Sequence, residues 1–126
     1  LKDPDGAIVL PEAVSKEPLG PAVRHGDDQW FDIVKWTHFA MLAAEELGVS
    51  KANVDEMVKS ENPDIKRLLG TEGKHGAALG LTNLPHTHAD PADLERTVGQ
   101  GSPLKISRGQ NALWTKGGLQ YAPPIR

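Results

Sequence analysis

The densest cluster of possible metal ligands in the sequence is the run His86-Thr87-His88-Ala89-Asp90. Two histidines two positions apart lie on the same side of an extended segment, and the carboxylate of Asp90 could complete a site for a divalent cation. The run itself places no fourth ligand, although His75 could fold over it. The competing interpretation is a solvent-exposed polar loop, and metal binding through His86, His88 and Asp90 is the less favoured of the two.

No set of residues has the types and spacing of a catalytic site. The acid pairs Asp27-Asp28 and Glu45-Glu46 occupy positions that cap helices or face water, whereas a general acid needs a carboxyl group with a raised pKa in a cleft. The glycine clusters lack the context of a phosphate-binding loop, and no serine sits in a nucleophile elbow. Lys105, Arg108 and Lys116 are expected to form a solvated basic face. We therefore predict a protein that is not an enzyme and needs no cofactor.

Composition limits the partners of this chain. Its 126 residues carry a net charge of −3, which argues against nucleic acid as the main partner because a phosphate backbone requires a basic face. There are no cysteines, so disulfides, thiolate nucleophiles and cysteine-based zinc sites are excluded. No apolar run approaches the length of a membrane span. The sequence begins without a methionine or a leader-like segment, so we expect that a segment was removed or that the chain is a piece of something longer.

The strongest predicted element is a long helix over about residues 27–47. Apolar residues recur there at helical spacing, Asp27 and Asp28 are good capping residues, and Gly48 is a typical stop. Because apolar side chains surround much of this helix, we expect it to need cover on two faces.

The remaining predicted elements are short. They are strands at 7–10 and 22–24, a helix capped by Ser50, a helix from Asn62-Pro63 to Gly70, a helix to about residue 98 that starts at Asp90-Pro91, and a helical stretch that opens at Ser102-Pro103 and ends at Gly117-Gly118. Two short strands do not make a stable sheet. The elements therefore call for partners that this chain hardly supplies.

Three stretches, which together cover most of the chain, resemble one protein family. They are residues 8–12 with 15–30 (SKEPLGPAVRHGDDQW), residues 45–48 with 53–57 and 62–70 (NPDIKRLLG), and residues 101–105 with 111–124 (NALWTKGGLQYAPP). The family comprises the substrate-binding components of bacterial ABC transporters for general and polar L-amino acids, and the resemblance is to its C-terminal third only. Residues 82–94 depart from the family pattern, being shorter, interrupted by proline and rich in histidine.

The resemblance implies an α/β fold that is helix-rich in this part, namely a portion of a type II periplasmic-binding-protein clamshell. Residues 1–18 would form the hinge strand that crosses between lobes, and residues 19–126 would form the C-terminal part of lobe one. Ser15, Lys16 and Glu17 would border the ligand cleft at the hinge. The groups that bind the ligand's carboxylate and ammonium would come mainly from parts of the family fold that this sequence does not contain.

The implied function is non-catalytic capture of a polar L-amino acid (glutamate, glutamine, aspartate or asparagine) in the periplasm, followed by delivery to an inner-membrane ABC permease. Two alternatives from other classes remain open. One is a small His-rich metal-binding protein. The other is a structural module that forms a homodimer through the helix carrying Trp30 and Trp36, since an uncovered apolar face is a plausible interface.

Overall fold

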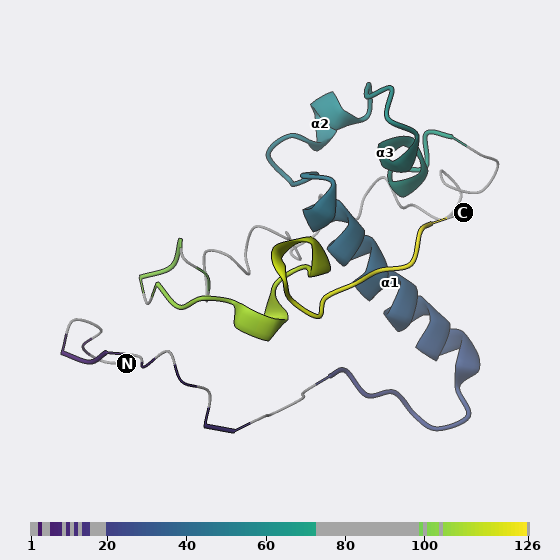
Figure 1. Cartoon of the computed structure of the whole chain (residues 1–126). Helices are drawn as coiled ribbons and strands as arrows, with labels where there is room; N and C mark the ends of the chain where they lie inside the picture. Colours follow the sequence, from purple (N-terminus) through teal and green to yellow (C-terminus); the bar gives the residue numbers. More distant parts are fainter. Residues whose placement is uncertain are drawn as a thin grey trace.

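The computed structural model describes residues 3, 6–8, 10, 12, 14–15, 20–72, 99, 101–103 and 105–125. The elements within these residues are, in chain order, α1 (Asp28–Glu46), α2 (Val54–Met57), α3 (Pro63–Leu68) and the 3-10 turns η2 (Gly109–Asn111) and η3 (Trp114–Lys116). Figure 1 shows α1 as the long central element, with α2 and α3 at its C-terminal end and the end of the chain passing beside it.

Helix α1 begins and ends where the sequence predicts, because both ends satisfy their free backbone groups. The carboxylate of Asp27 accepts a hydrogen bond from the N–H of Trp30 at 3.2 Å. At the other end Gly48 adopts a φ of +68°, and the next residue, Val49, donates its N–H to the carbonyl of Ala44 at 2.8 Å. This is a Schellman motif, in which a left-handed glycine closes the last turn. The predicted long helix is confirmed.

Helix α3 is likewise bounded by local chemistry. The side chain of Asn62 accepts a hydrogen bond from the N–H of Asp64 at 2.9 Å. Gly70 ends the helix with a φ of +67°, which lets the N–H of Thr71 reach the carbonyl of Lys66 at 2.9 Å. The predicted third helix is therefore confirmed at both ends.

Helix α2 starts at Val54, so the prediction that Ser50 caps the second helix is wrong. Asn53 occupies the capping position, but its side chain turns back along the chain. Its Oδ1 accepts a hydrogen bond from the Ser50 N–H at 2.8 Å, and its Nδ2 donates to the Gly48 carbonyl at 2.9 Å. Residues 51–53 form turns, and the helix begins only after them.

The hydrophobic core joins the C-terminal half of α1 to α2 and α3. Its members are all at most 6% exposed: Ala40, Ala44, Val49, Val54, Ile65, Leu68 and Leu69. Ile125, close to the end of the chain, packs against this cluster. The core therefore holds the last described residues against the helices that precede them by more than fifty positions.

The helical stretch predicted from Ser102 to Gly117 is wrong, because two residues within it have left-handed backbone angles. Lys105 has a φ of +49° and Gly109 a φ of +51°, values that an α-helix does not contain. Instead, η2 and η3 fold into a closed loop, in which the Gln120 N–H donates to the carbonyl of Ala112 at 3.1 Å.

Among the described residues there is no β-strand, and pairing is limited to one isolated parallel bridge between Leu113 and Gln120. Residues 7, 8, 10 and 22–24 are not in strands, so the two predicted strands are not found where they are described. A strand requires a neighbour for its hydrogen bonds, and the described part of the chain provides none for these residues. The helix predicted to start at residues 90–91 lies outside the described ranges.

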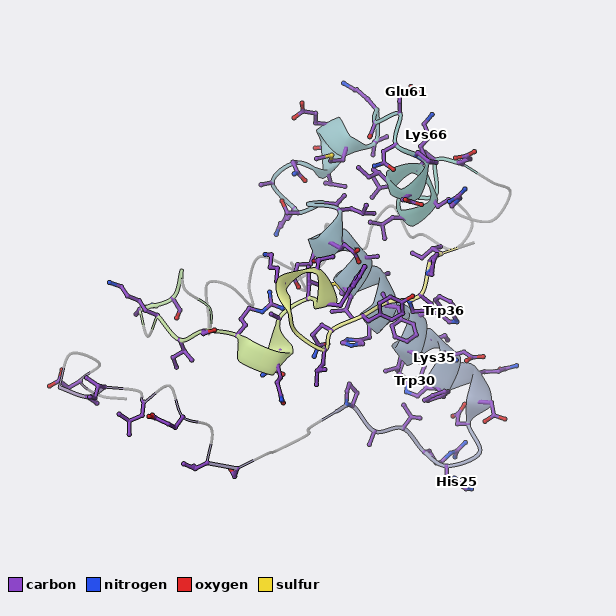
Figure 2. All side chains as sticks on the ribbon, in the orientation of Figure 1. His25, Trp30, Lys35, Trp36, Glu61 and Lys66 are labelled. Carbon is purple, nitrogen blue, oxygen red and sulfur yellow. The ribbon has the colours of Figure 1, made fainter. Side chains whose placement is uncertain are left out.

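The N-terminal half of α1 is open to solvent. Trp30, Ile33 and Trp36 are 53%, 56% and 45% exposed, and Figure 2 shows both tryptophans at the end of α1 remote from Glu61 and Lys66. This exposure agrees with the expectation that α1 needs cover that this chain hardly supplies. Neither α1 nor another helix within the described ranges is long and apolar enough to cross a membrane.

Candidate functional site

The predicted hinge residues lie in a stretch that is only partly described. Ser15 is exposed, and its neighbour Val14 is 96% exposed. Lys16 and Glu17 lie outside the described residues. The assignment of these three residues to the ligand cleft therefore stays a prediction.

The predicted metal ligands His86, His88 and Asp90 lie outside the described residues, as does His75. Within the described ranges, no group of three or more His, Cys, Asp or Glu residues is arranged to hold a metal ion. That search does not reach the histidine run, so metal binding there stays a prediction.

A groove of about 250 Å³ lies between α1, α3 and the C-terminal segment. Its described lining is mainly apolar: Ala43, Leu47, Leu68, Trp114, Tyr121, Ala122, Pro123, Pro124 and Ile125, with the two acids Glu46 and Asp64. The rings of Trp114 and Tyr121 meet edge to face, with centroids 6.0 Å apart. These lining residues include no Lys or Arg, so the groove offers no cation to the carboxylate of a free amino acid.

The described guanidinium with the least solvent contact is already engaged. Arg108 and Glu45 have side chains that are 8% and 12% exposed, and they form a two-pronged ion pair. Nη2 of Arg108 donates to Oε2 of Glu45 at 3.1 Å and to the carbonyl of Asn111 at 2.9 Å. The expectation that Arg108 and Glu45 face water is wrong. The two side chains are largely buried and neutralise each other's charge. The partners are 63 positions apart, so no local pattern could have revealed the pair.

A second ion pair lies at the start of α3. Nζ of Lys66 donates to Oε2 of Glu61 at 2.8 Å. This hydrogen bond lowers the pKa of Glu61 and raises the pKa of Lys66. Glu61 is 93% exposed, so the pair is a surface contact and not a candidate binding site.

Comparison with known proteins identifies relatives over nearly the whole chain, although no family model matches it. The general L-amino acid-binding periplasmic protein AapJ of Rhizobium johnstonii is 61% identical over 134 aligned positions, which cover 100% of this chain and 39% of AapJ. The glutamate/glutamine/aspartate/asparagine-binding protein BztA of Rhodobacter capsulatus is 49% identical over 94% of this chain and 37% of BztA. The chain is homologous to part of an amino-acid-binding protein of ABC transporters.

A solved structure supports the same relationship in three dimensions. It is an ABC transporter periplasmic binding protein from Brucella ovis with glutathione bound, 52% identical to this chain, with a TM-score of 0.81. The match covers 94% of this chain and 40% of that chain. The predicted fold class, a helix-rich portion of a periplasmic-binding-protein fold, is confirmed.

The chain spans about two fifths of the length of the binding proteins it matches. The alignment with AapJ has 134 positions against 126 residues, so this chain lacks positions that AapJ has. The groove and the Arg108–Glu45 pair are therefore features of one part of a periplasmic-binding-protein fold. The described lining of the groove has no cation, and Arg108 is already engaged by Glu45, so neither feature offers a cation to the carboxylate of a free amino acid.

Proposed function

We propose that this chain is the C-terminal part of lobe one of the binding component of an ABC-type L-amino-acid uptake system. Residues 1–18 serve as the hinge crossing and residues 19–126 belong to the lobe. The observation that supports this proposal is the identity of 49–61% with BztA and AapJ over 94–100% of the chain. Because both relatives are named as binding proteins, the complete protein captures a ligand without catalysis and without a cofactor.

The ligand is a polar L-amino acid: glutamate, glutamine, aspartate or asparagine. Its α-carboxylate needs a donor such as a guanidinium, and its ammonium needs a carboxylate. The Arg108–Glu45 pair satisfies itself, and the described lining of the groove has no cation. This part of the protein therefore supplies scaffold and hinge, while most ligand groups come from the rest of the protein. Ser15, Lys16 and Glu17 border the cleft from the hinge.

The complete protein works in the periplasm. Closure of its two lobes on the amino acid creates the surface that the inner-membrane permease recognises, and the hinge residues absorb the rotation. We do not expect a nucleic acid as the main partner, because the net charge of −3 disfavours binding to a phosphate backbone.

The test uses a hybrid protein in which this chain replaces the matching segment of AapJ. Calorimetry measures the binding of glutamate, glutamine, aspartate and asparagine to the hybrid and to the isolated chain. We expect the hybrid to bind at least one of them with micromolar or tighter affinity, and the isolated chain to bind weakly or not at all. Circular dichroism verifies that the hybrid is folded.

A folded hybrid that binds none of the four amino acids would contradict the proposed function. Tight binding by the isolated chain would contradict the assignment of most ligand groups to the rest of the protein. The hinge assignment has its own variant, Lys16→Met, with Lys51→Met at an exposed position of the helical part as the matched control. We expect only Lys16→Met to weaken binding by the hybrid.

A further inference from the structure

The groove between α1, α3 and the C-terminal segment combines aromatic walls with acidic side chains. Trp114 and Tyr121, whose rings meet edge to face, are 52% and 55% exposed. Pro123 and Pro124 continue the apolar wall, and Figure 1 shows this last segment of the chain passing beside α1. The groove therefore presents aromatic surface that an incoming group can contact directly.

Glu46 gives this groove a negative charge that nothing in its described lining balances. The other acid of the lining, Asp64, accepts a hydrogen bond from Nη1 of Arg67 at 3.1 Å, which offsets its charge. Glu46 is exposed and forms no ion pair with another described residue. A carboxylate beside aromatic rings complements a cation, because the face of an aromatic ring also attracts positive charge.

The size and shape of the groove favour a single side chain over a whole free molecule. Its volume of about 250 Å³ is below the roughly 300–1,000 Å³ of small-molecule pockets, which bury most of their ligand. Rings that are half open to water do not enclose a ligand in that way. A side chain carried by a polypeptide needs less enclosure, because the rest of that polypeptide makes contacts of its own. Protein interfaces are accordingly enriched in Trp, Tyr and Arg.

We propose that this groove docks an arginine side chain presented by an extended segment of a partner protein. A guanidinium is planar, so it can stack on the ring of Trp114 or Tyr121 while its N–H groups donate to Glu46. The aliphatic stem of the arginine packs against the apolar lining, which includes Ala43 and Leu47. Lysine would pair with the carboxylate as a point charge but could not stack in this way. The capture of an amino acid does not require this groove, so the proposal goes beyond the proposed function.

A pentapeptide with blocked ends and a central arginine, Ala-Ala-Arg-Ala-Ala, tests this proposal. It is titrated into this chain and into the hybrid with AapJ, and binding is followed by NMR through the indole N–H signal of Trp114. That signal is identified in each protein by its absence from the spectrum of Trp114→Phe. We expect saturable binding to both proteins, with a dissociation constant of about 1 mM or below.

Matched peptides and matched variants separate the parts of the proposed contact. A citrulline peptide, which keeps the shape of arginine without its charge, should bind at least about tenfold more weakly, and a lysine peptide about threefold more weakly. Glu46→Gln should weaken binding of the arginine peptide at least about fivefold, because the guanidinium loses its charged acceptor. Glu56→Gln is the control, since Glu56 is exposed on α2 outside the groove lining, and it should leave the affinity unchanged. Circular dichroism verifies that each protein is folded.

A folded chain that does not bind the arginine peptide would overturn the proposal. Equal affinity for either matched peptide, or an equal effect of Glu46→Gln and Glu56→Gln, would overturn it as well. Binding to this chain but not to the folded hybrid would also overturn it, because the rest of the binding protein would then occupy the groove. A hybrid that docks the peptide but binds no amino acid would contradict the proposed function and leave this proposal intact.

Discussion

Arg108 and Glu45 join the loop that precedes η2 to the last turn of α1 through two parallel contacts between guanidinium and carboxylate. The two side chains are 8% and 12% exposed. Both charged groups have lost most of their hydration, so each depends on the other to offset the cost of its burial. This contact and the packing of Ile125 on the core hold the C-terminal segment against the helices.

Removal of one partner of this pair is expected to be costly. Arg108→Met leaves the carboxylate of Glu45 buried without a counter-charge, and we expect the free energy of unfolding to fall by about 3 kcal/mol. The double variant Glu45→Leu with Arg108→Met should be more stable than Arg108→Met alone, since it removes the stranded charge. Urea unfolding followed by circular dichroism measures both. Equal stability of Arg108→Met and the unmodified chain would show that the ion pair does not contribute to the free energy of unfolding.

Gly118 is expected to tolerate no side chain. A Cβ at this position would lie 1.9 Å from the carbonyl oxygen of Ala112, so the closed loop must open to admit it. We expect Gly118→Ala to lower the free energy of unfolding by about 2 kcal/mol or more. Gly20→Ala is the matched control, because nothing lies within 4 Å of the added Cβ and no positive φ is involved. Thermal unfolding compares the two, and equal melting temperatures would contradict the close approach.

The cap of α3 provides a third test. Asn62→Ala removes the side-chain oxygen that accepts the N–H of Asp64 at 2.9 Å, and we expect a loss of about 1 kcal/mol of stability. Asn62→Asp should retain most of the stability, because aspartate is an equally good capping residue and its charge suits a helix N-terminus. Urea midpoints of the two variants measure the difference. A similar loss in both would mean that another property of Asn62 matters.

The Glu61–Lys66 pair predicts a pH dependence on two sides. The hydrogen bond lowers the pKa of Glu61, so its contribution is present above the ordinary pKa of 4.5 and is lost as the pH falls through the lowered value. The same bond raises the pKa of Lys66, so that contribution is present below the ordinary 10.5 and is lost as the pH rises through the raised value.

Urea midpoints measured against pH check this dependence. Glu61→Gln and Lys66→Met should each flatten the curve on both sides, because each removes the charged hydrogen bond that shifts both pKa values. Both effects should be small, since Glu61 is 93% exposed. Unchanged acid-side curvature in Glu61→Gln would exclude the pair as its source.

The limits of prediction from sequence follow from how far apart the interacting residues are. Asp27 and Gly48 mark the ends of α1, and Asn62 and Gly70 mark those of α3, because caps act within a few residues. The predicted cap at Ser50 is wrong, because residues 51–53 form turns and α2 begins only at Val54. Ser50 and Asn53 are both good capping residues, and the sequence does not show which of them precedes the helix.

For the candidate site too, local sequence patterns could be predicted and contacts between distant residues could not. The family resemblance could be predicted because whole stretches of the sequence carry it, and the relatives confirm it over 94–100% of the chain. The groove could not be predicted, since Glu46, Asp64 and Tyr121 meet there only after the chain has folded back on itself. The strand-like sequence at 22–24 also failed to predict a strand, because a strand exists only together with a neighbour.

The amino-acid sequence by itself determined the positions of α1 and α3 and the family to which their pattern is related, since capping and helical periodicity operate over a single turn. The tertiary structure alone decided that Arg108 is buried against Glu45 and that the apolar stripe of α1 is covered at Ala44 but open at Trp30. Burial depends on which distant segments come together, and that is a property of the folded chain as a whole.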